Sequence, residues 1–317
     1  MRNPVRSLLA ATVVLLVVAA GCAHDQKVTA GGSTTTVPDP GEPTTTTTAP
    51  PTTEVVQPGG YRDLVFRVVD CCGFTSADVA LTSLPIISVM GDGTALLAGE
   101  GLPGGGDPGD GAALPNIRRG NVPPDALAAL IEQARADGFL DHEVDFGTPG
   151  VTDLAYTTVT MVVDGTTHTL SAYALGYHSD PAEPRPQDGG TGVSAAQEEL
   201  RTKLSALISS ARDAVHDPAR AYVPERISVF ALPVPDASNG VVTPTVRPWP
   251  LDDPGAWAAG PAGVERCRTY AGADAQTVFA AAQAASVADI WGVTGKATHR
   301  LEFRPLLPDE TSKCEQT

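Results

Sequence analysis

The sequence predicts an α+β fold: an antiparallel sheet built from β-hairpins and covered by helices, followed by a smaller α+β unit. Two segments alternate apolar and polar residues on both sides of a glycine-containing turn, which is the pattern of a β-hairpin. Two helix patterns separate and follow these hairpins, without the regular strand-helix alternation of a parallel sheet. This order predicts helices on one face of an antiparallel sheet.

The strands of the first unit are expected in three segments. Residues 61–70, YRDLVFRVVD, alternate as a half-buried strand does. Residues 84–99 place two β-rich runs on either side of Gly91-Asp92-Gly93, and residues 157–176 repeat this design around Asp164-Gly165. Two hairpins are therefore the expected skeleton of the sheet.

Two helices are expected to cover that sheet. The first begins near Pro124 and ends at Gly138, with apolar residues at helical spacing between them. The second begins at Ser194, where Gln197 three residues later completes a capping box, and it continues to about Ala211. Residues 61–215 are thus predicted to form one α+β domain.

A smaller α+β domain is expected at residues 222–317, after a break at residues 216–224. It contains a strand in ERISVFALPV, an alanine-rich helix at residues 274–285 and a last strand within residues 296–310. Few aromatic residues are available for its core, so we expect a covalent cross-link to support it.

The N-terminal residues 1–21 have the pattern of an export signal. Arg2 and Arg6 form a positive region, and Leu8–Ala20 is an apolar run of thirteen residues. A membrane-spanning helix needs roughly 20 such residues. Small residues then precede Cys22, whose thiol can be acylated, and this arrangement resembles the lipobox of bacterial lipoproteins. The alternative is ordinary signal cleavage near the same site, which also gives a secreted protein.

Residues 22–60 are rich in threonine and proline and carry few apolar side chains. Such a segment cannot bury enough apolar surface to offset its ordering entropy, so we expect a disordered linker. The layout of signal, lipobox, Thr/Pro-rich stalk and α+β region with a cysteine-bearing tail resembles secreted lipoproteins of the actinobacterial (high-GC Gram-positive) type. The resemblance implies a lipid anchor in the cell membrane and an extracytoplasmic location. It implies no particular activity.

The chain carries 21 basic against 37 acidic residues, a formal net charge of −16. This charge repels phosphate backbones and anionic headgroups, so we expect no nucleic-acid partner. Contact with the membrane is then expected through the N-terminal lipid, and the partner is expected to be an envelope protein or a small ligand.

Apart from Cys22 the chain has four cysteines, which allow three pairings in an exported protein. We favour Cys267–Cys314, because both lie near the C-terminus and a bridge would fix the tail. Cys71 and Cys72 are adjacent in sequence. They could form a vicinal disulfide, pair outward or remain thiols.

Acidic residues and one histidine cluster just after the first predicted helix, at Asp141, His142, Glu143 and Asp145. Carboxylates suit hard cations, and a histidine would extend the choice to zinc. Neighbouring residues of an extended segment point to opposite faces, so these four would need help from elsewhere, for example from His168 or His178. The alternative is a polar exposed turn between helix and strand.

Aromatic residues suggest a second kind of site. Tyr173, Tyr177 and His178 could form an aromatic lip with Trp249 and Trp257 of the smaller domain, because exposed aromatic side chains give binding surfaces their affinity. The alternative is that Tyr173 and the tryptophans seal the contact between the two domains.

No catalytic signature of the G-x-S-x-G, S-x-x-K, H-E-x-x-H or C-x-x-C type occurs in the chain. We therefore expect a binding or interaction module without enzymatic activity or cofactor. One alternative is a transporter's solute receptor, which would require a βαβ core. The other is an envelope hydrolase or metal enzyme, which would require His142 or His168 beside carboxylates in a cleft.

Overall fold

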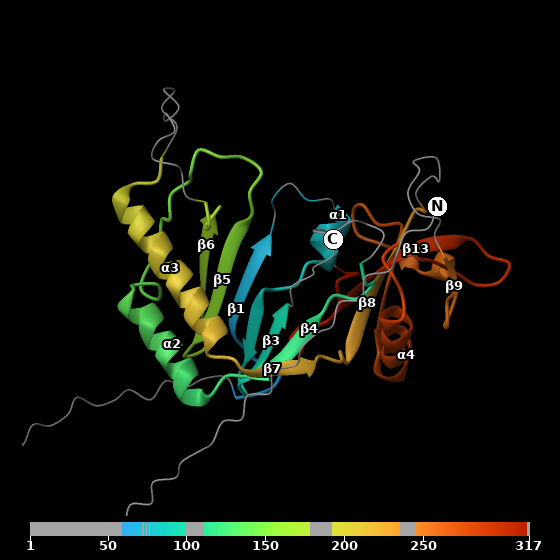
Figure 1. Cartoon of the computed structure of the whole chain (residues 1–317), viewed down its shortest axis with the longest axis horizontal. Helices are drawn as coiled ribbons and strands as arrows, with labels where there is room; N and C mark the ends of the chain where they lie inside the picture. Colours follow the sequence, from blue (N-terminus) through green and yellow to red (C-terminus); the bar gives the residue numbers. More distant parts are fainter. Residues whose placement is uncertain are drawn as a thin grey trace, which may run out of the picture. The chain divides into compact units, whose positions relative to one another are not determined.

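A computed structural model describes residues 59–71, 73, 75, 77–98, 111–177, 192–234 and 245–315. All of them belong to one compact unit, Thr53–Thr317. Among the described residues the fold contains a seven-stranded sheet, a six-stranded sheet and four α-helices, which confirms the α+β class (Figure 1). No helix in this part of the chain has the length and apolar character needed to cross a membrane.

The seven-stranded sheet has the order β6-β5-β1-β2-β3-β4-β7, and all its neighbouring strands are antiparallel. Both predicted hairpins are present. In the β5–β6 hairpin, Asp164 and Gly165 have positive φ angles of 50° and 75°, as a two-residue type I′ turn requires. The strands are β1 Leu64–Cys71, β2 Ile87–Met90, β3 Thr94–Ala98, β4 Ile117–Asn121, β5 Tyr156–Val163, β6 Thr166–Tyr173 and β7 His216–Ala221.

Helices α2 (Pro124–Ala136) and α3 (Ala195–Asp213) cover one face of this sheet. Both ends predicted from local signals are confirmed. Gly138 has a φ of +77° directly after α2, and Ser194 and Gln197 form the reciprocal capping box of α3. Leucines of both helices pack on alternate residues of β5 and β6, so the opposite face of this hairpin lies away from the helices.

The segment at residues 216–224 was expected to be a break, but residues 216–221 form strand β7 beside β4. All six residues of β7 are exposed, so the segment lacks the apolar alternation by which a strand is found in a sequence.

The six-stranded sheet has the order β10-β11-β8-β13-β12-β9, in which only β9 and β12 are parallel. Helix α4 packs against β8 and β11, and the short helix α1 contacts β13. The elements are α1 Ala77–Thr82, β8 Arg226–Leu232, β9 Val246–Pro248, the 3-10 helix η2 Pro254–Ala256, β10 Ala258–Ala259, β11 Arg266–Ala271, α4 Gly272–Gln283, β12 Ile290–Gly292 and β13 Thr298–Pro305.

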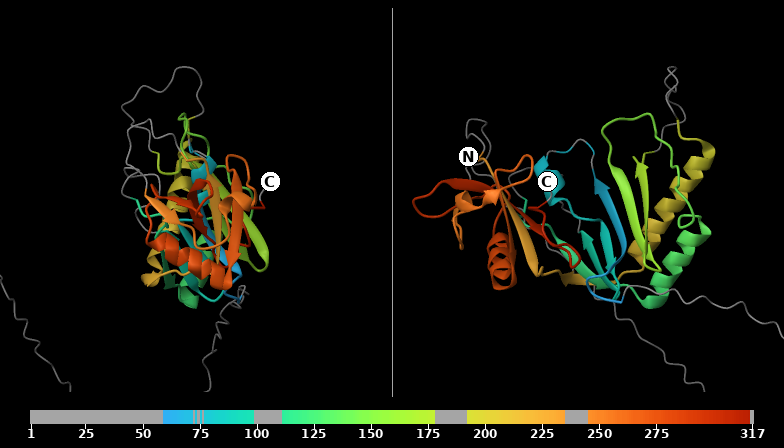
Figure 2. Two further views of the ribbon diagram at one scale, coloured as in Figure 1. Left: turned by 90° about the vertical axis from the view of Figure 1, so that its right-hand side faces the viewer. Right: turned by 180° about the vertical axis from the view of Figure 1, so that it is seen from behind.

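The chain after β13 contacts both sheets. Figure 2 shows the two sheets from two further directions. Leu307 lies in an apolar cluster with Met90 and Leu96 of the seven-stranded sheet. Arg67 of β1 binds Asp309 at 2.7 Å, and the Tyr222 hydroxyl donates to the carbonyl of residue 306 at 2.7 Å. This tail therefore covers the β1–β4 part of the sheet face that lies away from α2 and α3.

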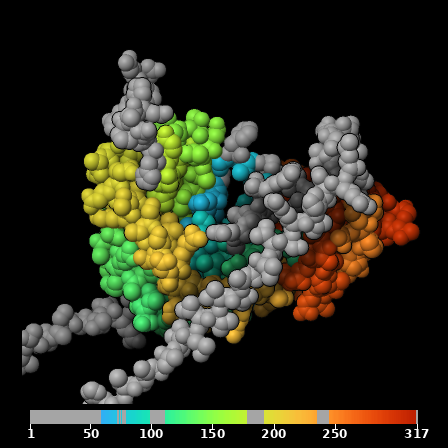
Figure 3. All heavy atoms as spheres, viewed as in Figure 1, coloured from blue at the N-terminus to red at the C-terminus, as the bar shows by residue number. Residues whose placement is uncertain are grey.

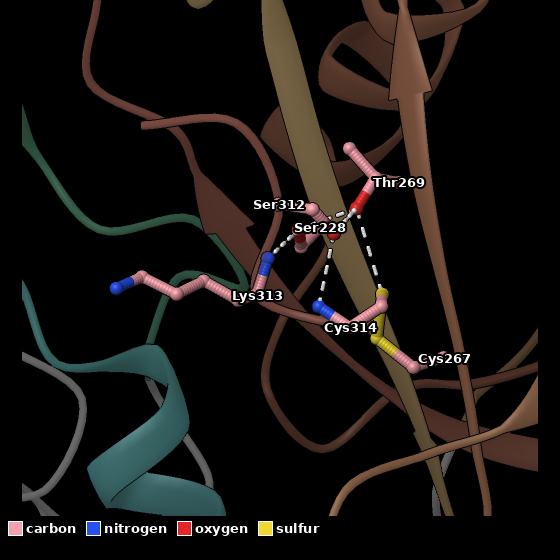
Figure 4. The surroundings of a disulfide bond; sticks show 6 residues. All are labelled: Ser228, Cys267, Thr269, Ser312, Lys313 and Cys314. Atoms are coloured by element: carbon pink, nitrogen blue, oxygen red, sulfur yellow. Dashed lines mark hydrogen bonds between the residues drawn. A yellow bond between two sulfur atoms is a disulfide. The ribbon is translucent and has the colours of Figure 1, made fainter. Parts of the chain in front are cut away.

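A disulfide joins Cys267 of β11 to Cys314, which is the pairing that the sequence favoured (Figure 4). Beside it, the Thr269 hydroxyl lies 2.8 Å from both the Ser228 and the Ser312 hydroxyls. The tail is thus attached to β8 and β11 by a covalent bond and by a chain of hydroxyl groups. Cys71 is disulfide-bonded as well, and Cys22 and Cys72 lie outside the described residues.

Candidate binding site

A pocket of about 390 Å³ lies between the open end of the β5–β6 hairpin and the segment that follows α2. We call it the tyrosine pocket. The space-filling view shows the β5–β6 region beside α3 at the surface of the molecule (Figure 3). The pocket is lined by Glu143, Val144, Asp145, Phe146, Gly147, Thr148, Tyr156, Ser171 and Tyr173.

Two tyrosines form the strand side of the pocket. Tyr156 of β5 is the direct cross-strand partner of Tyr173 of β6, and their ring centroids lie 5.0 Å apart with a tilt of 51°. Tyr156 is 43% exposed, and its neighbour Leu154 is 38% exposed. Of the four large exposed apolar or aromatic side chains in the described part of the chain, Tyr156 lines this pocket, and the backbone of Leu154 is bonded to the Tyr173 hydroxyl beside it. Such exposure of rigid aromatic surface is typical of a binding site.

Tyr173 is fixed in place by its hydrogen bonds. Its hydroxyl donates to the Val151 carbonyl at 3.0 Å and accepts from the Leu154 N–H at 3.2 Å. Its own carbonyl accepts from the guanidinium of Arg201 in α3 at 3.0 Å. The ring and the loop before β5 are therefore held together before any ligand arrives, which reduces the entropy cost of binding.

Arg201 is the charged group behind the pocket, and its side chain is only 2% exposed. It also donates to the carbonyl of Ala174, a residue with a φ of +49°. Burial lowers the pKa of Arg201, and the nearby Glu198 carboxylate opposes this shift. Arg201 of α3 donates hydrogen bonds to the carbonyls at the end of β6 and so fixes the position of Tyr173.

The other wall of the pocket is attached to the start of α3. Asp145 accepts hydrogen bonds from the Gly147 N–H and from the Gln197 side-chain amide, both at 2.9 Å. Gly147 has a φ of +67°, and a Cβ there would lie 2.7 Å from the Gln197 amide oxygen, so another residue would be strained and would displace the Gln197 side chain. Glu143 is exposed and has no hydrogen bond or ion pair within the described part of the chain. It therefore brings an unpaired carboxylate to the pocket.

The predicted metal cluster does not form as a unit. Glu143 and Asp145 line the tyrosine pocket, whereas Asp141 and His142 do not. Across the described ranges, no group of three or more His, Cys, Asp or Glu side chains is arranged to hold a metal ion. His168 lies on β6 opposite Met161, five residues before Tyr173, and does not line the pocket. The exposed-turn interpretation describes Asp141 and His142 better, since both are exposed.

The predicted aromatic lip is wrong for the two tryptophans. Trp249 and Trp257 are 5% and 3% exposed, and their rings lie 5.7 Å apart in the core of the six-stranded sheet. Packing against Trp291 and Tyr270 buries more of their large apolar surface than a surface position would. They do not seal a contact with Tyr173 either, because that residue lines the pocket of the other sheet.

The last two residues of the predicted lip are not part of the pocket lining that the structure describes. Tyr177 is half-buried, and its N–H donates to the Ala174 carbonyl at 3.0 Å in a turn after β6. His178 lies outside the described residues.

The sequence patterns did not identify Tyr156, Ser171 or Arg201 as site residues. The first two could have been found by counting outward from the two-residue turn, since pairing Val163 with Thr166 also pairs residue 156 with residue 173. Arg201 carries no such signal, because its role depends on how α3 packs against the end of β6.

A second pocket, of about 360 Å³, lies at the start of α4. Its lining includes Arg62 and Glu225, which form an ion pair at 2.5 Å and are 60% and 56% exposed. Its one carboxylate is thus already paired, unlike that of Glu143, and Arg226, which also lines this pocket, donates to the Pro308 carbonyl at 3.4 Å.

Comparison with known proteins finds no match, neither to a family model, nor to a curated protein sequence, nor to a solved structure.

Proposed function

We propose that the chain is a binding module displayed on the extracytoplasmic face of a cell membrane, anchored by a lipid on Cys22, and that the tyrosine pocket is its binding site. The observation that carries the proposal is the pair of adjacent tyrosines, one immobilised and one 43% exposed, beside the Glu143 carboxylate, which has no partner among the described residues. A concave site of this volume with a few fixed polar groups is the usual form of a ligand pocket.

The alternative functions find less support in the geometry. A solute receptor would need a βαβ core, and the described strands pair antiparallel with the one exception of β9 and β12. A metal enzyme or hydrolase would need His142 or His168 in a cleft with carboxylates, and neither lines either pocket described above.

The proposal can be tested with protein labelled with ¹³C on its six tyrosines. The protein is mixed with a solubilised envelope extract of the producing cell, and the tyrosine ring resonances are recorded. We expect saturable changes at Tyr156 and Tyr173. The resonances of Tyr222 and Tyr270, which are 5% and 3% exposed, serve as internal references and should stay unchanged.

Single tyrosine-to-phenylalanine variants assign the six resonances. A spectrum in which the extract leaves Tyr156 and Tyr173 unchanged would refute the proposed site. Equal changes at the buried reference tyrosines would also refute it, because they would indicate unfolding or nonspecific association.

A further inference from the structure

We propose that the tyrosine pocket receives a lysine or arginine side chain from a partner protein, and that the partner's extended segment pairs with the edge of β6. This inference rests on the proposed function of the pocket as a binding site. It adds the class of partner and the way in which the partner docks.

The charges at the pocket select a cation. Glu143 and Asp145 line it, and none of its lining residues within the described part of the chain is a lysine, arginine or histidine. Arg201, behind Tyr173, is buried and donates to backbone carbonyls. The formal net charge of the whole chain is −16, so the long-range field also attracts basic partners and repels acidic ones.

The tyrosine rings add a specific attraction for a cation. An ammonium or guanidinium group within about 6 Å of an aromatic centroid is attracted by the ring, by roughly 0.5–1 kcal/mol at exposed sites. Tyr156 and Tyr173 offer two such rings on one wall, and Glu143 lies on the other. The apolar stem of a lysine or arginine can pack on the exposed surface of Leu154 beside the pocket.

The edge of β6 indicates that the cation belongs to an extended protein segment. Among the described strands β6 pairs with β5 alone, over eight residues in unbroken register, and it contains no proline, lysine or arginine. Long regular edges of this kind accept an added strand. Ser171 and Tyr173 belong to β6 and line the pocket. The Tyr173 carbonyl is already bonded to Arg201, so a strand added to this edge would pair with the residues before Tyr173 and end beside the pocket.

The other edges of the two described sheets are protected. β7 contains Pro218, a positive φ at Asp217 and an irregular register with β4. β10 has two residues, and β9 has three and ends at Pro248. These are the features by which proteins prevent pairing at sheet edges. Their absence from β6 singles out this edge.

A basic partner fits this edge better than a second copy of the chain. Two copies paired through β6 would bring like net charges together, which is unfavourable, whereas a basic segment gains from the same field. The protein alone is therefore expected to be monomeric in sedimentation equilibrium, and a dimer dissociated by a change in β6 would overturn the choice of partner.

The test is a titration of the ¹³C-tyrosine-labelled protein with three capped heptapeptides, Thr-Val-Thr-X-Thr-Val-Thr, in which X is lysine, norleucine or glutamate. We expect the lysine peptide to shift the resonances of Tyr156 and Tyr173 and to bind about tenfold more tightly than the norleucine peptide. The glutamate peptide should bind least. A lysine peptide with all its backbone amides N-methylated has no N–H to donate to β6, so it should bind at least several-fold more weakly.

Two variants test the groups in the pocket. Glu143→Gln should weaken the lysine peptide about threefold without affecting the norleucine peptide. Tyr156→Leu should weaken binding of the lysine peptide about fivefold. Tyr156→Phe keeps the aromatic ring and should bind this peptide as tightly as the unaltered protein does. The reference tyrosines report whether each variant remains folded.

Equal binding of the lysine and norleucine peptides would overturn the role of charge. Equal binding of the N-methylated peptide would overturn the pairing with β6. If an envelope extract shifts Tyr156 and Tyr173 but no basic peptide does, this inference fails and the pocket remains a site for another ligand. If neither shifts them, the proposed function fails too.

Discussion

The disulfide between Cys267 and Cys314 is expected to be the largest single contribution to the stability of the six-stranded sheet. It joins residues 47 apart in sequence. In the chain-entropy model, closing a loop of this length removes denatured-state entropy worth about 4 kcal/mol at 25 °C. Replacing both cysteines with alanine should therefore lower the free energy of unfolding by about this amount, and the transition temperature by roughly 8–16 °C.

The assay is urea unfolding followed by tryptophan fluorescence. All three tryptophans of the chain, Trp249, Trp257 and Trp291, lie in the core of this sheet, so the signal reports on its unfolding. The matched control is Ser312→Ala, which removes a hydroxyl bonded to Thr269 at 2.8 Å but leaves the cross-link intact. A net hydrogen bond is worth about 1 kcal/mol, so the control should lose much less.

A loss in the double variant no larger than in the control would refute the loop-closure reasoning. Such a result would mean that noncovalent contacts keep the tail close to β11 even in the denatured ensemble, so that the cross-link removes little entropy. The Arg304–Glu310 pair at 2.8 Å, with side chains 2% and 9% exposed, would then be the first contact to test. Unfolding under reducing conditions is not an equivalent experiment, because the disulfide of Cys71 would be broken too.

Three further predictions address the anchor, the site and the pH dependence. Cys22→Ser should move the protein from the membrane fraction to the soluble fraction, and a variant that stays membrane-bound would contradict lipidation at this residue. Arg201→Met should lower the free energy of unfolding in urea by about 2–3 kcal/mol, because two carbonyls lose a charged donor. The control Lys203→Met, on the exposed side of α3, should lower it by less than about 0.5 kcal/mol. Equal losses in the two variants would contradict the role given to Arg201. Burial raises the pKa of Tyr222 and of Tyr270, so these tyrosines ionise at lower pH in the unfolded chain than in the folded protein. Their contribution to the free energy of unfolding is complete below about pH 10 and is lost as the pH rises further. Stability measured from pH 8 to 11 should therefore fall at the alkaline end, and a flat profile would contradict this assignment.

The parts of the fold that depend on local signals could be predicted from the sequence. The Asp164-Gly165 turn specifies the β5–β6 hairpin, and the Ser194–Gln197 pair specifies the start of α3. Strand β7 could not be found in this way, because its six residues are all exposed and show no alternation. It becomes a strand only by pairing with β4, which is tertiary information.

The candidate site combines residues that the sequence suggested for separate reasons. Glu143 and Asp145 belonged to a possible metal cluster, and Tyr173 to an aromatic lip. What unites them is α3, which binds Asp145 through Gln197 and the Tyr173 carbonyl through Arg201. The position of the tryptophans could not be predicted from the sequence. Their size makes them suitable for an interface or for a core, and only the packing of the six-stranded sheet decides between the two.

The distribution of stabilising contacts explains why a binding surface can exist at the β5–β6 end of the sheet. The tail after β13 covers the same face near β1 and β2, through the Arg67–Asp309 pair and the burial of Leu307. At β5 and β6 that face instead presents Tyr156 and Ser171, which are exposed. Since the core beneath them is formed by the opposite face, substitutions of Tyr156 should change binding with little loss of stability. Because the residues that stabilise the fold and those that would bind lie on opposite faces of the hairpin, the binding face can be substituted without disturbing the core.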